Sequence, residues 1–164
     1  MQVTPLLTQT TAGKIAAGHL FAAQTAGGSG GLFIRAAEGE TATKAFADVK
    51  SIDTDVTAVQ LAPRSTLLNW LVAIPADAIV SDVTHAVALA YDVAPENLRY
   101  PNPTQPSFTA LVAGDVLVDG EATKLVCMGP NPAIGIAFID LDSGEITLGI
   151  GPNPMQIVSW WLDF

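Results

Sequence analysis

The chain has one cysteine, little charge and no long uninterrupted apolar run. Cys127 cannot form a disulfide within the chain, which suits a protein made in a reducing cytosol, and its apolar neighbours predict a buried structural thiol. Apolar runs such as residues 67–76 are interrupted by Asn69 and Pro75 and are shorter than the roughly 20 residues of a membrane-spanning helix. The first residues lack a basic segment followed by an apolar one, so we expect no signal peptide and no membrane partner.

Positive charge is scarce. Seven Lys and Arg residues stand singly along the chain against sixteen Asp and Glu residues, which gives a net charge of −9. Binding to nucleic acid depends on a clustered basic surface, so we expect no nucleic-acid partner. Only 14% of the residues are charged, and the mean hydropathy is +0.39. Such a chain usually buries apolar surface against copies of itself or another protein, and its acidity suits a basic partner.

Motifs for metal or phosphate binding are lacking too. His19 and His85 are far apart in sequence, and His85 alternates with Val83 and Val87, which predicts a packed histidine in a strand. The glycine-rich residues 25–31 run into Leu-Phe-Ile, whereas a phosphate-binding loop ends in Gly-Lys-Ser/Thr and begins a helix. The glycine-rich stretch therefore predicts a turn between two strands.

The acidic residues show no arrangement typical of a catalytic or calcium site. Asp140, Asp142 and Glu145 resemble part of a calcium loop but lack its third ligand and its later glutamate, which favours an acidic hairpin tip. No spacing singles out a carboxylate pair for glycoside hydrolysis, and Ser65 lacks the Gly-x-Ser-x-Gly context of an activated nucleophile. We therefore predict no catalytic residue, no cofactor and no metal.

Alternation of apolar and polar residues recurs along the chain and predicts strands. In the last third, two such strands flank Asp142-Ser143-Gly144, which predicts an antiparallel hairpin, and Asp119-Gly120 predicts a second tight turn. At 164 residues the chain is long enough for one domain with its own core. The prediction is a mainly β protein, an antiparallel β-sandwich or barrel with at most one or two short helices. Residues 1–13 would form an extended N-terminal arm and residues 14–164 a single β-rich domain.

Several segments fit more than one element. Residues 14–24 fit a short strand or an alanine-rich helix, although Gly18 weakens the helix. Residues 65–74 fit a covered strand or a short buried helix. A proline at the start of residues 75–82 predicts a helical turn. Residues 83–91 alternate as a strand does, although their alanines also fit a helix.

The tripeptide Pro-Asn-Pro occurs at residues 101–103, 130–132 and 152–154. Proline fixes its own φ, has no N–H to donate, and forces the residue before it into an extended conformation. The last two copies stand at the two feet of the predicted hairpin. We therefore interpret the repeat as a structural corner, not as a ligand site.

The C-terminal segment QIVSWWLDF predicts a strand that carries two adjacent tryptophans. Neighbouring residues of a strand point to opposite faces, so one tryptophan fills the core while the other needs a second cover. That cover is a partner subunit, where tryptophan is often a hot spot, or a second layer of the same fold. With the apolar residues of the arm, this gives the candidate interface residues Pro5, Leu6, Leu7, Trp160, Trp161 and Phe164.

A threonine-rich arm, MQVTPLLTQTT, precedes a strand of small residues, a glycine-rich turn, a Gly-Leu-Phe strand and an acidic turn within residues 14–43. This order resembles capsid cement or decoration proteins of tailed phages. The resemblance implies a non-enzymatic virion protein, made in the host cytoplasm, that stabilises the shell from the capsid exterior. It also implies a homo-oligomer, with a trimer favoured, bound to the major capsid protein or another virion protein.

The resemblance carries over no functional residue, and two other functions stay open. One is a phage tail, fibre or surface module that binds a glycan or a protein, which exposed aromatic residues would favour. The other is a small hydrolase that uses a carboxylate pair, which a concave pocket with two acids of raised pKa would favour.

Overall fold

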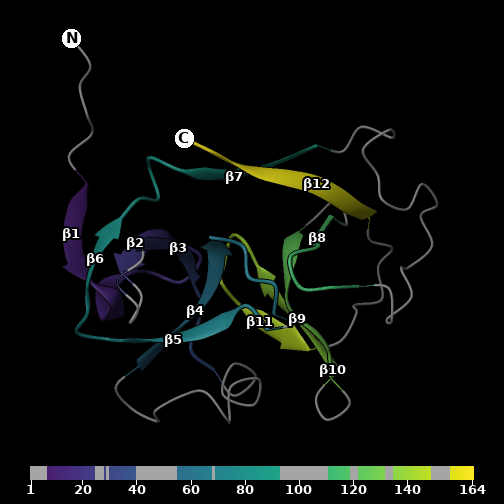
Figure 1. The fold of residues 1–164 in the computed structure, drawn as a ribbon, viewed down its shortest axis with the longest axis horizontal. Coiled ribbons are helices and arrows are strands. Elements are labelled where there is room, and N and C mark those ends of the chain that lie inside the picture. The colour runs from purple at the N-terminus through teal and green to yellow at the C-terminus, as the bar shows by residue number, and fades with distance from the viewer. Residues whose placement is uncertain are drawn as a thin grey trace.

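Two antiparallel β-sheets of six strands each form the fold (Figure 1). The computed structural model describes residues 7–24, 28, 30–39, 55–67, 69–92, 111–118, 122–131, 135–148 and 156–164. The mainly β prediction is confirmed, and the sandwich is the better of its two architectures because neither sheet closes into a barrel. Among these residues the one helix is a short 3-10 turn, η1 (Ala12–Lys14), and none is long and apolar enough to cross a membrane.

In each sheet four consecutive strands lie side by side in chain order, and the two remaining strands pair at the β2 end of sheet 1 and at the β8 end of sheet 2. Sheet 1 has the order β1-β6-β2-β3-β4-β5 and sheet 2 the order β11-β10-β9-β8-β12-β7. The strands of sheet 1 are β1 (Thr8–Thr11), β2 (Leu20–Gln24), β3 (Gly30–Arg35), β4 (Asp55–Ala62), β5 (Leu71–Pro75) and β6 (Ile79–Asp82). The strands of sheet 2 are β7 (Ala88–Asp92), β8 (Val116–Val118), β9 (Thr123–Asn131), β10 (Gly135–Asp140), β11 (Ile146–Leu148) and β12 (Gln156–Asp163).

Sheet 1 is strongly coiled. Three residues separate Pro75, at the end of β5, from Ile79, at the start of β6, although three strands lie between β5 and β6 in the sheet. Four residue steps of extended chain reach about 14 Å, whereas the four strand spacings of a flat sheet would add to about 19 Å. The sheet therefore curls to bring β5 toward β6, and the Ala12 N–H bonds to the Ala78 carbonyl to tie η1 to their connection.

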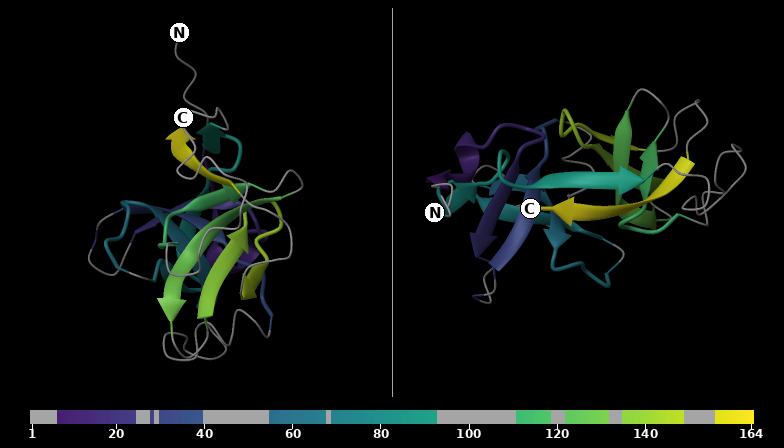
Figure 2. Two further views of the ribbon diagram at one scale, coloured as in Figure 1. Left: turned by 90° about the vertical axis from the view of Figure 1, so that its right-hand side faces the viewer. Right: turned by 90° about the horizontal axis from the view of Figure 1, so that it is seen from above.

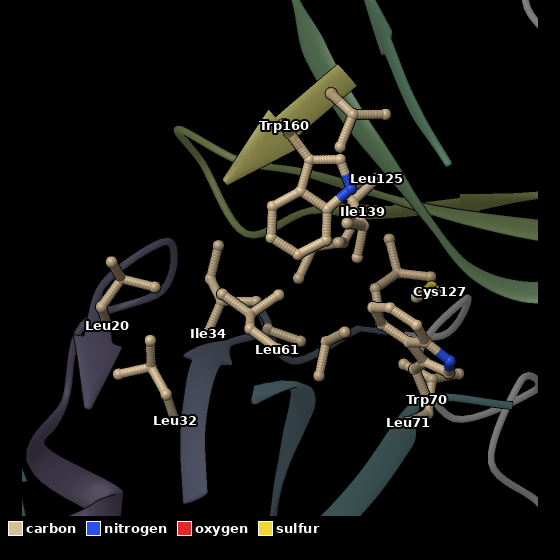
Figure 3. Packing of buried hydrophobic residues seen from close by; sticks show 14 of the residues in the cluster. Leu20, Leu32, Ile34, Leu61, Trp70, Leu71, Leu125, Cys127, Ile139 and Trp160 are labelled. Carbon is tan, nitrogen blue, oxygen red and sulfur yellow. The ribbon is translucent and has the colours of Figure 1, made fainter. Parts of the chain in front are cut away.

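The largest hydrophobic cluster lies between the two sheets (Figure 3). Ile34 of β3 and Leu61 of β4 point toward sheet 2, where Leu125, Ile139 and Trp160 face them. These residues come from strands far apart in sequence. Their burial is the main contribution that holds one sheet on the other.

Both sheets are also buried on parts of their second faces. On sheet 1, the rings of Phe21 and Phe33 stack with centres 5.5 Å apart, in a cluster that includes Ala12 of η1. On sheet 2, Leu117 and Phe138 belong to a third buried cluster. Strands buried on both faces read as continuous apolar runs, which explains why alternation is weak in β3 and β10.

Strands β7 and β12 form a ribbon that extends from sheet 2 across sheet 1 (Figure 2, right). Strand β8 pairs with β12 only over residues 156–158, whereas β7 pairs with residues 159–163. Among the described strands, β7 is thus the sole neighbour of the second half of β12. This geometry carries Phe164 over sheet 1.

The predicted N-terminal arm needs correction at its second half. Thr8–Thr11 is extended, as predicted, but pairs with β6 as the outermost strand of sheet 1, and Ala12 is fully buried. Its threonines favour a strand because β-branched side chains fit a pleated sheet. Residues 1–6 of the arm lie outside the described residues.

The predicted helical turn over residues 75–82 is wrong. Pro75 ends β5, and its carbonyl accepts the N–H of Ala78 to form a turn, after which the chain runs directly into β6. The proline fits at this position because it terminates an edge strand and need not donate to a ladder.

The single strand predicted over residues 83–91 is wrong too. Asp82 Oδ1 accepts the Thr84 N–H at 3.0 Å, and the N–H of Val87 bonds back to the carbonyl of Val83. These local bonds turn the chain, so that β7 starts only at Ala88. The two segments that fit either a strand or a helix, residues 14–24 and 65–74, run into strands β2 and β5.

One copy of Pro-Asn-Pro is partly described. Its asparagine, Asn131, is the last residue of β9 and pairs with Gly135, the first residue of β10, so the chain reverses directly after it. This position fits the predicted corner. The predicted hairpin around Asp142-Ser143-Gly144 is confirmed by the antiparallel pairing of β10 with β11. The other two copies and Asp119-Gly120 lie outside the described residues.

Candidate binding groove

A groove of about 880 Å³ opens on the inner face of sheet 1. The strand registers align one lining residue from each of five strands across its floor. From β1 to β4 this floor row consists of Gln9, Ser81, Ala22, Leu32 and Ala62. Residues directly opposite on antiparallel strands share one face of the sheet. Because Leu32 belongs to the core between the sheets, the groove is the uncovered end of that core.

The opposite wall comes from the β6–β7 connection and from the end of β12. Val83 and Val87 are buried there, whereas the ring of Phe164 is 88% exposed. On the side of β1 and β6, Leu7 is 47% exposed and Ile79 is 67% exposed. Large apolar side chains that stay exposed around a concave surface mark a place where another molecule binds.

None of the described residues that line the groove has a charged side chain. The polar side chains among them are those of Gln9, Gln24 and Ser81. Such a lining buries apolar groups and offers a few hydrogen bonds. The hydrolase interpretation calls for two acids that face one hollow, and this lining offers none. The groove is therefore suited to binding rather than to acid–base chemistry.

Two of the six predicted interface residues, Leu7 and Phe164, meet in this groove although they lie at opposite ends of the sequence. The tryptophans point to opposite faces of β12, as predicted: Trp160 is 9% exposed and fills the core, whereas Trp161 is 47% exposed. Trp161 does not line the groove. Pro5 and Leu6 lie outside the described residues.

The contribution of β6 to the groove was not predicted from the sequence. Ile79 and Ser81 line the groove, but the predicted helical turn over residues 75–82 hid them. A strand signal was present, because the polar residues at positions 77, 81 and 82 leave Ile79 and Val80 as an apolar pair between turns. This strand signal was too short to outweigh Pro75, the first residue of the segment.

The two histidines lie close enough to one carboxylate for their charges to act on it. Both His19 and His85 act on Asp82, which ends β6. The packed histidine predicted at position 85 is wrong, because this residue is exposed in the turn after β6. No group of three or more His, Cys, Asp or Glu side chains in the described part of the chain could hold a metal ion.

We expect the Asp82 carboxylate to contribute to stability in a pH-dependent way. Burial alone would raise the pKa of Asp82, but hydrogen bonds from the backbone and hydroxyl of Thr84, with the charges of His19 and His85, hold it below the ordinary value of 3.8. A lowered pKa stabilises the fold above the unfolded-state pKa, and this contribution is lost as pH falls through the folded-state value.

The variant Asp82→Asn keeps an acceptor for Thr84 but removes the charge. It should lower the free energy of unfolding at pH 6 by less than about 1 kcal/mol, because the carboxylate is partly exposed to solvent. Urea unfolding of both proteins at pH 6, 4 and 3 should show the difference shrinking toward pH 3. A difference that grows toward low pH would contradict this assignment.

Two further sequence candidates have structural roles. Cys127 is fully buried, as predicted, and burial raises the pKa of its thiol far above the ordinary value. At the hairpin tip, Asp140 Oδ1 accepts the N–H groups of Asp142 and Ser143 and also the Ser143 hydroxyl. This carboxylate therefore closes a turn.

No protein-family model, no curated protein and no solved structure matches this chain.

Proposed function

We propose that this protein is a non-enzymatic structural protein of a tailed-phage particle, of the capsid decoration type. Its groove docks on the major capsid protein or another virion protein at the capsid exterior and stabilises the shell. The proposal joins the resemblance of residues 14–43 to decoration proteins with one structural observation, the uncharged groove between Leu7 and Phe164. The copies associate, with a trimer favoured by the same resemblance.

The exposure of the groove supports a protein partner. Ile79 and Phe164 leave most of their apolar surface in water, which costs free energy that a partner would recover at about 25 cal/mol per Å² buried. The groove is long enough to lie across five strands and is open along the sheet. Such a surface accepts part of another protein's fold, and a protein that clamps subunits needs no reactive group.

Sedimentation of native protein through a density gradient tests this proposal. The wild-type protein should migrate with heavy particles in a lysate of phage-producing cells and be released by denaturant. Ile79→Asp places a charge in the groove and should weaken particle binding at least about tenfold. The matched control is Leu67→Asp, because Leu67 is 70% exposed, close to the 67% of Ile79, but does not line the groove. Wild-type protein found only as a small species would contradict the proposal.

A second candidate function is glycan binding by a tail or surface module. The observation in its favour is Trp161, exposed on β12 between the exposed Ser159 and Asp163. An aromatic ring beside a hydroxyl and a carboxylate suits the apolar face and hydroxyl groups of a sugar. Binding to a glycan array that is lost in Trp161→Ala but kept in Ile79→Asp would support this function over the first.

A further inference from the structure

Strand β1 is the outermost strand of sheet 1, and Figure 1 shows it at the margin of the molecule. The Ala12 N–H bonds to the Ala78 carbonyl, which continues the register of β1 on β6. Backbone groups alternate in direction along a strand, so Thr8 and Thr10 also bond toward β6. The N–H and C=O groups of Gln9 and Thr11 therefore point to the open side of β1.

This edge has no proline, no charged side chain and no bulge, although β1 is only four residues long. Natural edge strands are blocked by proline, lysine, bulges or very short length. The sequence of β1, TQTT, has neither proline nor charge. By contrast, β5 ends in Pro75 and packs near η1, and β11 is three residues long. Strand β7 is also an edge, but none of its own residues lines the groove.

The floor of the groove near this edge carries small side chains. Ala22, Ser81 and Gly30 line it, so the room that larger residues would fill is left open. An added strand would present every second side chain to this face, at about 7 Å intervals. The lining side chains are uncharged and the whole chain carries −9, which disfavours an acidic segment.

We propose that the groove takes an extended segment of the partner protein, which pairs with the open edge of β1 as an added strand. Every second side chain of that segment is bulky and apolar and stands beside Leu7 and Gln9, at the β1 end of the groove, and its flanking residues are neutral or basic. This inference rests on the proposed function, because it specifies how the same groove engages its partner.

A short synthetic peptide of alternating threonine and phenylalanine or leucine, with a lysine at each end, serves as the probe. Its binding should slow amide exchange at Gln9 and Thr11 of the wild-type protein, a readout that depends on no variant. The decisive pair of variants is Gln9→Pro, which removes the outward N–H, and Gln9→Ala, which keeps it. Proline is tolerated where the N–H faces away from the neighbouring strand, so both variants should keep the wild-type unfolding midpoint within a few degrees.

Gln9→Pro should weaken peptide binding about tenfold more than Gln9→Ala does, because both variants remove the amide side chain and only proline also removes the N–H. Replacing the lysines of the peptide by glutamate should also weaken binding. The inference is overturned if Gln9→Pro binds as well as Gln9→Ala, or if the peptide leaves exchange at Gln9 and Thr11 unchanged. Slowed exchange that depends on protein concentration without peptide would assign the edge to a second copy instead, and would also overturn it.

The gradient experiment separates this inference from the proposed function. If Ile79→Asp abolishes particle binding but the peptide does not bind the wild-type protein, the groove docks on the particle and the addition of a strand at β1 is rejected. If the peptide binds through Gln9 but the wild-type protein is absent from the heavy fractions, the virion function is rejected and the addition of a strand at β1 is supported.

Discussion

Replacing Gly144 by alanine is expected to lower the free energy of unfolding by about 2 to 5 kcal/mol, from backbone strain and overpacking together. Gly144 has φ of +72°, a conformation that L-residues rarely adopt. A β-carbon there would overlap the backbone nitrogen of Gly18 and lie 2.5 Å from the carbonyl oxygen of Arg35. Backbone atoms cannot rotate away as a side chain can, so the β10–β11 tip would have to move off sheet 1.

The matched control is Gly28→Ala. Gly28 has φ of +79°, similar to that of Gly144, but a β-carbon there would meet nothing within 4 Å. It should cost only the backbone strain, about 1 kcal/mol. Gly30→Ala, with neither positive φ nor a close neighbour, should be nearly neutral. Urea unfolding of the three variants measures these differences through the midpoint at constant slope. Equal losses in Gly28→Ala and Gly144→Ala would show that the close approach of the two sheets has no energetic role.

The close approach of Gly144 to Gly18 and Arg35 joins the two sheets at the end of the sandwich where the β10–β11 tip meets β3. The Ala37 N–H, just after β3, bonds to the carbonyl of Gly144 at 2.8 Å, next to the Gly18 N–H that bonds to the carbonyl of Arg35 within sheet 1. A second connection lies at β5, where the Trp70 N–H bonds to the carbonyl of Cys127. Backbone bonds thus supplement the apolar core in fixing sheet 1 on sheet 2. The groove stays open because no such bond joins Gln9 or Ser81 to sheet 2 among the described residues.

The fold class was readable from the sequence because local patterns determine it. Alternation predicted β12, and the turn residues Asp142-Ser143-Gly144 predicted the β10–β11 hairpin. Where local signals were misleading, a single side chain decided the outcome: Asp82 turns the chain by accepting the Thr84 N–H, within what otherwise reads as one alternating strand. The coil of sheet 1 could not be predicted, because it follows from the pairing of strands distant in sequence.

The candidate site was predictable only in part, for the same reason. Leu7 and Phe164 were predicted as interface residues because they are apolar and come from the arm and the C-terminal strand. That both line one groove depends on the β7–β12 ribbon crossing sheet 1. The floor residues Ala22 and Ser81 are small and unremarkable in sequence. Only the register places them in one row, and their small size becomes informative only beside an exposed edge strand.

The adjacent tryptophans of β12 should differ sharply when replaced by alanine. Trp160→Ala is expected to lower the free energy of unfolding by about 3 to 5 kcal/mol, the usual cost of removing a buried aromatic side chain. Its ring belongs to the core between the sheets, and its Nε1–H donates to the Gly114 carbonyl at 2.7 Å. The guanidinium carbon of Arg64 lies 4.2 Å from the ring centre, so a cation–π contact is lost as well.

Trp161→Ala is the matched control, since it removes the same side chain from the next residue of the same strand. It should lower the free energy of unfolding by only about 1 to 2 kcal/mol, because Trp161 is half exposed and outside the core. Urea unfolding followed by tryptophan fluorescence measures both variants, and equal losses would contradict the assignment of faces. Particle binding in the density gradient then supplies a second readout for Trp161. Reduced binding by a Trp161→Ala variant that is still fully folded would show that a partner covers this face of β12, whereas unchanged binding would confine docking to the groove on sheet 1.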